Sequence, residues 1–415
     1  METEILQKKE TKKVPHLRFG EYNGEWKNVI ISSISNKITD GTHDTPKSVN
    51  EGTPYLTAIH VKDGFIDFDN CYYLTKNDHE QIYKRCNPER GDLLMVNIGA
   101  GTATTALVNV DYEFSLKNVA LIKPNNSVVN SDFFSQVQRK NGLRLKHQLS
   151  SGGAQPFLSL KQIGKLKLNI PSLPEQQKIA NFLSAADKKI QQLTRKKELL
   201  EVYKKGVMQQ LFSRELRFKD ENGKDFPEWE EKKFGEVAVF LKGKGISKSE
   251  IAVDGFIKCI RYGELYTLYK ETIKLVHSRT NVPEKELVFS QKGDVIIPSS
   301  GETQLDIAKA SCVLDEKIAL GGDLNIIRSE ISGIYLAYYL NGALKYDIAR
   351  LSQGVSVVHL YSSQLKLLKL TLPSLKEQRK IAVFLSGIDI KIEAVSQQIT
   401  KTQSFKKGLL QQMFV

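Results

Sequence analysis

The sequence has little that would tie it to a metal, a disulfide framework or a membrane. Its four cysteines, Cys71, Cys86, Cys259 and Cys312, lie far apart and form no CxxC pair. This spacing argues against a zinc site or a disulfide framework and is typical of a reducing compartment. No run of about 18 apolar residues is present to span a membrane, and the charged start METEILQKKE lacks the apolar core of a signal peptide. We therefore expect a cytoplasmic protein.

Catalytic motifs are missing as well. No HExxH, GxSxG or Walker sequence occurs. The segment GAGTATT at residues 99–105 resembles a glycine-rich phosphate loop, but it lacks the Lys-Ser/Thr pair that closes one, so we predict a turn after a strand. A DNA methyltransferase would need an Asn-Pro-Pro-aromatic loop, and CNPE at residues 86–89 does not fit. We expect no catalytic residue, no metal site and no cofactor on this chain.

What the sequence does have is an ordinary globular composition with an excess of positive charge. Of its 415 residues, 40% are hydrophobic and 26% are charged, and the formal net charge is +13. A chain of this length has room for two or three domains that each bury a core. The excess of Lys and Arg favours nucleic acid as a partner.

One segment of the chain occurs twice. PSLPEQQKIANFLS at residues 171–184 returns as PSLKEQRKIAVFLS at residues 373–386, and this offset of 202 residues holds without a gap to Phe212 and Phe414. Shorter matches accompany it, namely Gly91-Asp92 with Gly293-Asp294, and LRF at residues 17–19 with LRF at residues 216–218. The chain is therefore two tandem copies of a unit of about 200 residues.

Each copy ends in a stretch that predicts a long helix. Pro174 is suited to a first helical turn, and no glycine or proline follows it until Gly206. Apolar residues recur at steps of four and three, the period of a coiled-coil seam, although Lys197 and Lys204 interrupt it. A helix packed in an ordinary core is the alternative. The seam residues are Ile179, Leu183, Ala186, Ile190, Leu193, Leu200, Val207 and Leu211 in the first copy, and Ile381, Leu385, Ile388, Ile392, Val395, Ile399, Leu409 and Met413 in the second.

The rest of each copy predicts a mixed globular domain. PYLTAIHV, GDLLMVNI, NVALIKP and GDVIIP predict strands between turns, while SDFFSQVQRKNGLRL and GIYLAYYLNGALKYDIARL predict helices. We predict an α+β fold with two globular mixed α/β domains in tandem repeat, each followed by a long helix. The predicted boundaries are 1–15 for an N-terminal tail, 16–170 for the first domain, 171–214 for the central helix, 215–372 for the second domain and 373–415 for the C-terminal helix.

Two stretches without acidic residues favour DNA binding. From Phe133 to Pro174, and again from Ile348 to Lys376, the chain has no Asp or Glu. Each stretch contains a glycine turn with Ser and Gln, LSSGGAQPFLS in the first copy and LSQGVSVV in the second. Lys and Arg neutralise phosphates, while Gln and Ser can bond to base edges. A solvated basic face would account for one such stretch, but two at equivalent positions favour DNA.

These patterns select candidate DNA contacts, which are polar residues in or beside predicted loops. The predicted residues are His43, Lys47, Asn97, Ser151, Gln155 and Lys161 in the first domain, and Lys242, Arg261, Ser299, Gln353, Ser356 and His359 in the second.

With these features in place, the sequence resembles the DNA specificity (S) subunit of type I restriction–modification systems. The resemblance covers almost the whole chain and rests on the paired PSLxEQxKIAxFLS segments, the paired KKG[VL][ML]QQ[LM]F endings and the GD strands. It implies two target-recognition domains that each read one half of a split DNA target. It also implies that the two long helices are antiparallel, form a coiled coil between the domains, and are related by pseudo-twofold symmetry.

The resemblance further implies partners. Two methyltransferase (M) subunits would transfer a methyl group from S-adenosylmethionine to adenine N6, and restriction (R) subunits would use ATP and Mg²⁺, while this chain would hold no active site. A coiled-coil scaffold that binds no DNA, and the specificity half of a fused restriction–methylation enzyme, are the alternatives. We expect the M subunits to contact the repeated segment at Glu175, Gln176, Ile179, Phe182, Leu183, Glu377, Gln378, Ile381, Phe384 and Leu385.

Overall fold

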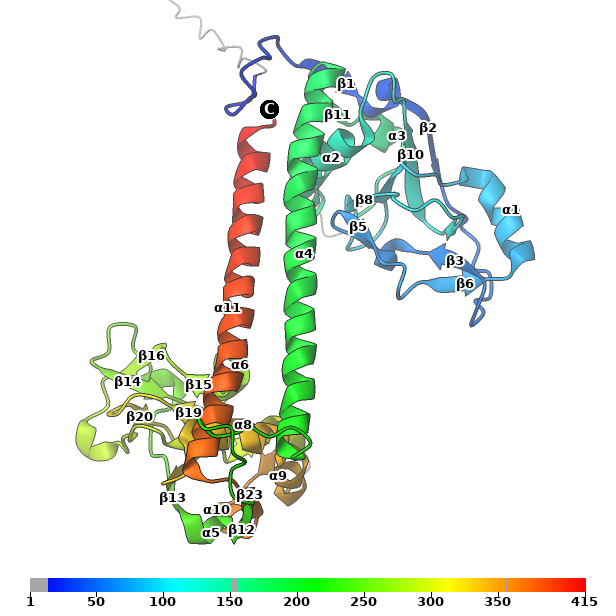
Figure 1. The fold of residues 1–415 in the computed structure, drawn as a ribbon. Coiled ribbons are helices and arrows are strands. Elements are labelled where there is room, and N and C mark those ends of the chain that lie inside the picture. Colours follow the sequence, from blue (N-terminus) through cyan, green and yellow to red (C-terminus); the bar gives the residue numbers. More distant parts are fainter. Residues whose placement is uncertain (1–13, 151–155, 355–356) are drawn as a thin grey trace, which may run out of the picture. The chain divides into compact units, whose positions relative to one another are not determined.

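The computed structural model describes residues 14–150, 156–354 and 357–415 (Figure 1). Its contacts divide the chain into two compact units. Unit 1 consists of the described residues up to Leu193 together with Gln398–Val415, and unit 2 consists of Thr194–Gln397. Residues 1–13 of the predicted N-terminal tail lie outside the described residues.

Unit 1 combines short strands with a few helices. Its strands are β1 (Lys27–Ile30), β2 (Ser35–Asp40), β3 (Thr53–Leu56), β4 (Val61–Lys62), β5 (Phe65–Ile66), β6 (Tyr72–Leu74), β7 (Leu93–Val96), β8 (Thr105–Leu107), β9 (Ser115–Leu116), β10 (Val119–Pro124) and β11 (Lys167–Ile170). Its helices are η1 (Ile31–Ile34), η2 (Ala58–His60), α1 (Lys76–Cys86), α2 (Ser131–Ser150), α3 (Leu160–Lys165) and the first part of α4 (Leu173–Phe212).

Unit 2 repeats this plan with additional elements. Its strands are β12 (Glu230–Lys233), β13 (Ala238–Lys242), β14 (Ile257–Ile260), β15 (Thr272–Ile273), β16 (Ser278–Thr280), β17 (Val295–Pro298), β18 (Ser300–Gly301), β19 (Ser311–Val313), β20 (Ala319–Leu320), β21 (Leu324–Ser329), β22 (Val358–His359) and β23 (Lys369–Leu372). Its helices are α5 (Phe234–Val237), η3 (Lys248–Glu250), α6 (Tyr262–Thr267), η4 (Glu284–Glu286), α7 (Gln304–Ile307), α8 (Gly333–Gly342), α9 (Lys345–Leu351), α10 (Ser362–Leu365) and the first part of α11 (Leu375–Gln412).

Each unit is built around a central sheet with both faces buried. The strand order is β2-β10-β7-β8 in unit 1 and β13-β21-β17-β19-β15 in unit 2. Along β7, Leu93 and Met95 face the core lined by α2, whereas Leu94 and Val96 face a second core. A strand buried on both faces has a continuous apolar sequence. This explains why the predicted strands GDLLMVNI and GDVIIP show no polar alternation.

The predicted strand PYLTAIHV is interrupted. It forms β3 and β4 with the helical turn η2 between them, because the backbone N–H of Thr57 donates to Nδ1 of His60 at 2.9 Å and closes a turn. Likewise, the predicted helix GIYLAYYLNGALKYDIARL divides into α8 and α9. A Cβ atom at Gly342, where α8 ends, would lie 2.9 Å from a ring carbon of Phe212. A larger residue at this position would therefore require the ring to move.

The two long helices, α4 and α11, pair within each unit through a lysine that is buried in unit 1 and largely buried in unit 2 (Figure 1). In unit 1, Nζ of Lys406 lies 2.5 and 2.6 Å from the carboxylate oxygens of Asp187, and Lys406 is only 5% exposed. In unit 2, Nζ of Lys204 lies 2.8 Å from a carboxylate oxygen of Asp389. Each pair joins α4 to α11 at positions related by the 202-residue offset, which explains the lysine that interrupts the seam of the first helix.

None of the helices in the described part of the chain combines the length and the apolar character that a membrane span needs.

Candidate nucleic-acid interface

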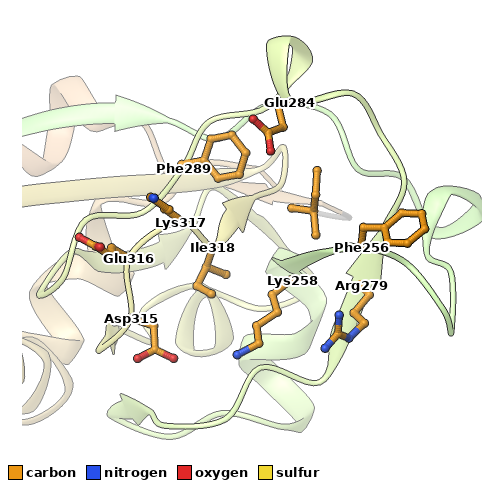
Figure 2. Close-up of a pocket in the computed structure, with 10 residues that line it drawn as sticks. Phe256, Lys258, Arg279, Glu284, Phe289, Asp315, Glu316, Lys317 and Ile318 are labelled. Atoms are coloured by element: carbon orange, nitrogen blue, oxygen red, sulfur yellow. The ribbon is translucent and has the colours of Figure 1, made fainter.

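Unit 2 contains an open pocket of about 760 Å³ beside the β16-β14-β20 sheet. Figure 2 shows that charged side chains of both signs line it, among them Lys258, Arg279 and Glu284. None of the predicted DNA contacts that lie within the described residues lines this pocket. Among the described residues, no group of three or more His, Cys, Asp or Glu side chains is placed to hold a metal ion.

Three of the predicted contacts of unit 1 gather instead at one edge of its central sheet. The ends of β2 and β7 and the start of β10 meet there, because these strands are antiparallel neighbours. His43 and Lys47 follow β2, and Asn97 follows β7. Asn118, directly before β10, was not singled out by sequence. We call His43, Lys47, Asn97 and Asn118 surface 1.

His43 is fixed at both ring nitrogens although its side chain is 61% exposed. Nδ1 lies 2.8 Å from Oδ1 of Asn118, and Nε2 lies 3.1 Å from Oδ2 of Asp40. An exposed side chain already held in one orientation loses less conformational freedom when it binds a ligand. Lys47 is exposed in the same loop, where a phosphate could reach it.

Asn97 differs from His43 in being buried, with 6% exposure. Its backbone oxygen accepts a hydrogen bond from the N–H of Leu158 at 2.8 Å, whereas its Oδ1 has no partner among the described residues. A buried polar atom without a hydrogen bond costs about 1–3 kcal/mol. Trp26 and Tyr335 also carry buried polar atoms without a partner among the described residues, so the place of Asn97 directly after β7 is what makes it a candidate contact.

Unit 2 has the corresponding edge, formed by the ends of β13 and β17 and the start of β21. Lys242 ends β13, Ser299 follows β17, and β22 with His359 pairs with β18 beside them. The structure thus brings five predicted contacts together, along with two residues that sequence reasoning missed. We call this set surface 2, and it consists of Lys242, Arg261, Ser299, Ser300, Asp323, Gln353 and His359.

A chain of hydrogen bonds organises surface 2. Nδ1 of His359 lies 3.2 Å from Oγ of Ser300, and Ser300 donates to Oδ1 of Asp323 at 3.2 Å. Gln353 and His359 exchange two backbone hydrogen bonds of 2.9 and 2.7 Å. Burial raises the pKa of Tyr266, so its hydroxyl stays protonated and donates to the backbone oxygen of Ser300 at 2.7 Å.

Ser299 and Arg261 resemble Asn97 in having polar atoms without a partner among the described residues, namely Oγ and Nε. Ser299 is buried, and its N–H donates to the backbone oxygen of Asp323 at 2.7 Å. Arg261 stands directly before α6, where its N–H donates to Oε2 of Glu264 at 3.2 Å. Both atoms are buried, so a base edge or a phosphate would reach them only if the side chains around them moved.

The two surfaces occupy equivalent places in the fold. Asn97 and Ser299 are related by the 202-residue offset, and so are their hydrogen-bond donors. The N–H of Leu158 reaches the oxygen of Asn97 at 2.8 Å, and the N–H of Leu360 reaches that of Ser299 at 3.0 Å. The backbone framework at this edge is therefore repeated, while the side chains on it differ.

A glycine directly after β2 in unit 1, and another directly after β13 in unit 2, let two segments of the chain pass closely. A Cβ atom at Gly41 would lie 2.1 Å from the oxygen of Leu116, and one at Gly243 would lie 1.8 Å from the oxygen of Gly321. Contacts this short are forbidden, so only glycine fits. The side chains on this repeated backbone differ. Exposed Phe157 occupies the position in unit 1 that His359 occupies in unit 2.

Some predicted contacts are not brought into these surfaces. Lys161 is exposed in α3, which packs against η1 and β2. Ser151, Gln155 and Ser356 lie outside the described residues. Two cations of the first acid-free stretch are used within unit 1, since Arg139 pairs with Asp63 at 3.0 Å and Lys140 donates to the backbone oxygen of Phe414 at 2.8 Å.

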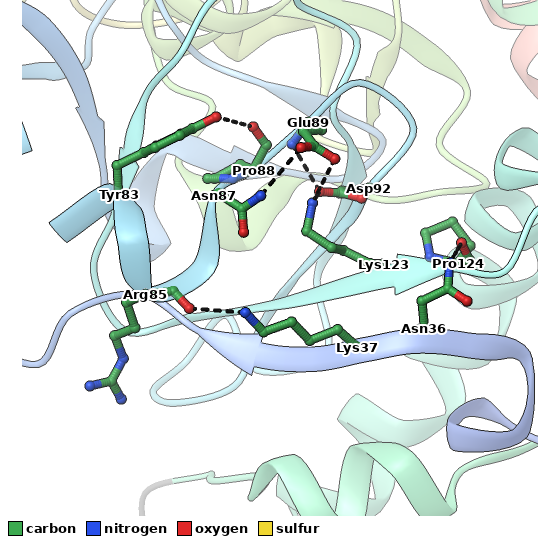
Figure 3. A network of polar contacts seen from close by, with 10 residues as sticks. All are labelled: Asn36, Lys37, Tyr83, Arg85, Asn87, Pro88, Glu89, Asp92, Lys123 and Pro124. Atoms are coloured by element: carbon green, nitrogen blue, oxygen red, sulfur yellow. Dashed lines mark hydrogen bonds and ion pairs between the residues drawn. The ribbon is translucent and has the colours of Figure 1, made fainter. Parts of the chain in front are cut away.

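The repeated Gly-Asp pair forms a turn before the central strand of each unit. Figure 3 shows the first turn, where the carboxylate of Asp92 accepts the N–H of Glu89 at 2.9 Å and Nζ of Lys123 at 2.8 Å. In the second turn, Asp294 accepts both Nε and Nη2 of Arg328, at 2.9 and 2.7 Å. Gly91, with φ of 93°, supplies the left-handed conformation that the first turn needs. This repeat is structural.

The repeated glutamate is buried against an arginine in each unit. Arg18 donates to both carboxylate oxygens of Glu175 at 2.7 Å, and Arg217 donates to those of Glu377 at 3.1 and 3.3 Å. The side chain of Glu175 is only 1% exposed. A guanidinium matches a carboxylate in this two-bond geometry, so an internal ion pair accounts for the paired LRF and EQ motifs.

The repeated glutamine also bonds inside its own unit. Oε1 of Gln176 accepts the N–H of Asn130 at 2.9 Å, and Oε1 of Gln378 accepts the N–H of Ser332 at 3.0 Å. Each glutamine Nε2 donates to the carbonyl of the proline five residues earlier, at 3.0 and 2.9 Å. These bonds fix the start of each long helix to the globular part.

Two phenylalanines among the predicted contacts with M subunits are not fully buried. Phe182 is 40% exposed and meets Phe19 edge to face at 5.8 Å, and Phe384 meets Phe218 at 5.4 Å. The other apolar members lie in the unit cores, and they are Ile179, Leu183, Ile381 and Leu385. The predicted contact with M subunits stays a prediction, and these two rings are the members best placed for it.

Comparison with known proteins identifies the framework that carries both surfaces. A family model described as the type I restriction modification DNA specificity domain matches residues 23–202 and again residues 227–402. The chain belongs to this family. Its specificity domain therefore occurs twice in tandem, and two recognition domains fit the reading of a bipartite DNA target.

Relatives support the assignment over nearly the whole chain. The specificity subunit of the type I restriction enzyme MjaVIII from Methanocaldococcus jannaschii is 25% identical over 377 residues, which is 86% of this chain and 84% of that protein. The crystal structure of the S subunit of a type I restriction–modification system from M. genitalium has the same fold, with a TM-score of 0.62, 16% identity, and coverage of 97% of this chain and 99% of that one.

A second solved chain has a similar fold. It comes from a study of complex assembly and conformational transition in the type I restriction–modification system, with a TM-score of 0.54, 16% identity, and coverage of 93% and 95% of the two chains. The prediction of a type I specificity subunit with a tandem α+β fold is confirmed.

Proposed function

We propose that surface 1 reads one half of a split DNA target and surface 2 reads the other half. The observation that carries this proposal is that both surfaces stand at the same edge of equivalent sheets and present different side chains. A common frame gives both readers one way of approaching DNA, and different side chains give them different base preferences. His43 and His359 are the central contacts, because each is hydrogen-bonded and accessible.

The partners that we propose are two M subunits and a set of R subunits. Two identical M subunits need two equivalent docking positions, and exposed Phe182 and half-buried Phe384 stand at positions related by the 202-residue offset. The M subunits would bind S-adenosylmethionine and methylate adenine N6, and the R subunits would bind ATP and Mg²⁺. This chain would select the DNA site in the cytoplasm and contribute no catalytic group.

Mapping of N6-methyladenine tests this proposal. The chain and its M subunits are expressed in a host without other adenine methylation, and the control expresses the M subunits alone. We expect a two-part methylated motif with an unread gap only when this chain is present. A motif that is unchanged without the chain, or one that is continuous, would contradict the proposal.

A further inference from the structure

Two residues at the surfaces have an unusual backbone conformation. Asn118 has φ of 52° and Asp323 has φ of 57°, and each stands directly before a strand of the central sheet of its unit, β10 or β21. Residues other than glycine seldom adopt this left-handed conformation. Where they do, a function or a local hydrogen bond commonly accounts for it.

The backbone of both residues ties neighbouring loops together. The N–H of Asn118 donates to the oxygen of Thr42 at 3.2 Å, next to His43. The oxygen of Asp323 accepts the N–H of Ser299 at 2.7 Å. Glycine would form the same backbone bonds with less strain. The side chain is therefore the feature that distinguishes Asn and Asp from glycine at these positions.

Both side chains lead to a histidine of the surface. Oδ1 of Asn118 bonds directly to Nδ1 of His43 at 2.8 Å. Oδ1 of Asp323 accepts a hydrogen bond from the hydroxyl of Ser300 at 3.2 Å. The same Oγ of Ser300 lies 3.2 Å from Nδ1 of His359. In both units, an oxygen from the left-handed residue fixes the Nδ1 side of the ring, directly or through one hydroxyl.

We propose that Asn118 and Asp323 are positioning residues for DNA recognition, which orient His43 and His359 toward the bases of their half-sites. This inference rests on the proposed function. A ring that is free to rotate presents donors and acceptors in several directions, whereas a fixed ring presents one pattern. Sequence discrimination at the base pair that the ring faces therefore depends on the oxygen at Nδ1, which in unit 1 acts together with the Asp40 carboxylate at Nε2 of His43.

Substitution by glycine separates this role from a structural one. Asn118→Gly and Asp323→Gly remove the side chain from a backbone that glycine adopts readily, so the melting temperature should be maintained or should rise. We expect Asn118→Gly to reduce discrimination about tenfold at one or two base pairs of one half-site. Asp323→Gly should do the same in the other half-site, as measured by methylation mapping of the assembled complex.

Two kinds of control variant accompany these changes. Asn118→Asp and Asp323→Asn keep an acceptor oxygen, so discrimination should be retained. Asn87→Gly makes the same substitution at another left-handed residue of unit 1, with φ of 37°, at the end of α1. The side chain of Asn87 bonds to Glu89, which pairs with Lys123 at the opposite end of β10, so the motif should stay as it is.

The outcomes distinguish this inference from the proposed function. A folded Asn118→Gly complex with an unchanged motif would overturn the inference while leaving the two-reader function in place. Loss of discrimination in both half-sites together with a lower melting temperature would show that the residues act only in folding. A wild-type complex without a two-part motif would contradict the proposed function itself.

Discussion

Arg18 shows what a single side chain contributes to unit 1. It forms two hydrogen bonds to Glu175, whose carboxylate is almost fully buried. Arg18→Ala should lower the free energy of unfolding by about 3–5 kcal/mol, because it leaves a buried charge without a partner. Urea denaturation measures the change.

Lys178→Ala is the matched control for Arg18→Ala. Lys178 pairs with Glu21, and both side chains are largely exposed. Exposed ion pairs contribute about 0–1 kcal/mol, so this variant should be nearly as stable as the wild type. Equal effects of the two substitutions would mean that the buried pair does not anchor the start of α4.

The buried cysteines provide a second test at the level of single residues. Burial raises the pKa of the Cys312 thiol to about 12 and the pKa of Cys86 and Cys259 to about 11. Because the thiolate is the reactive form, these thiols stay protonated at pH 8. We expect negligible alkylation by iodoacetamide in the native protein, and modification of all four cysteines, including buried Cys71, in denaturant. Rapid labelling of the native state would contradict the described cores.

The residues of the surfaces were only partly predictable from the sequence. Polarity and position in a loop selected His43, Asn97, Ser299 and His359, which the fold brings to equivalent edges. Asn118 and Asp323 were missed, since a left-handed backbone angle at a residue other than glycine leaves no clear mark in a sequence. Charge alone also does not show that Arg139 and Lys140 bond to acceptors inside unit 1, namely the carboxylate of Asp63 and the backbone oxygen of Phe414.

At the scale of elements, the long helices were the most predictable feature. The apolar period is repeated over many turns, so a single polar residue such as Lys204 does not obscure the helical pattern. The helices α4 and α11 extend over 40 and 38 residues. The short strands were less predictable. PYLTAIHV has a uniform β-like sequence, yet Thr57 and His60 form a turn that only the folded backbone reveals.

Docking of M subunits is tested on the same helices. Phe182→Asp places a carboxylate on an accessible ring position, so the chain should fold but fail to assemble, because burial of an unpaired charge is costly. Size-exclusion chromatography of the co-expressed subunits measures assembly. Asn181→Asp adds the same charge one residue away and should leave assembly intact. Normal assembly of the Phe182→Asp chain would show that this ring lies outside the docking surface.

At the scale of the whole molecule, the two ends of the repeat are connected in the same way. In unit 1, the N–H of Leu17 donates to the oxygen of Gln412 at 2.9 Å, although these residues belong to opposite ends of the chain. In unit 2, the N–H of Leu216 donates to the oxygen of Gln210 at 3.0 Å, across a continuous connection. The end of the second copy is therefore bonded to the start of the first copy in the same way as the end of the first copy is bonded to the start of the second.

A circular permutant tests this closure. The chain is opened between Phe212 and Leu216, and residue 415 is joined to residue 1 by a short linker. Because Leu17 and Gln412 are already in contact, the permutant should fold and methylate the same motif as the wild type. A second permutant, opened inside β10, should fail to fold. Loss of folding in the first permutant would contradict the equivalence of the two connections.

The central claim is that this chain reads two half-sites with two separate surfaces. Methylation mapping of three complexes tests it most directly, with His43→Ala, His359→Ala and both substitutions together. Each single substitution should relax discrimination at one half-site by about 1–3 kcal/mol. The double substitution should relax both, and the gap between the half-sites should stay the same in all three. A single substitution that changes both half-sites equally would contradict the two-reader account.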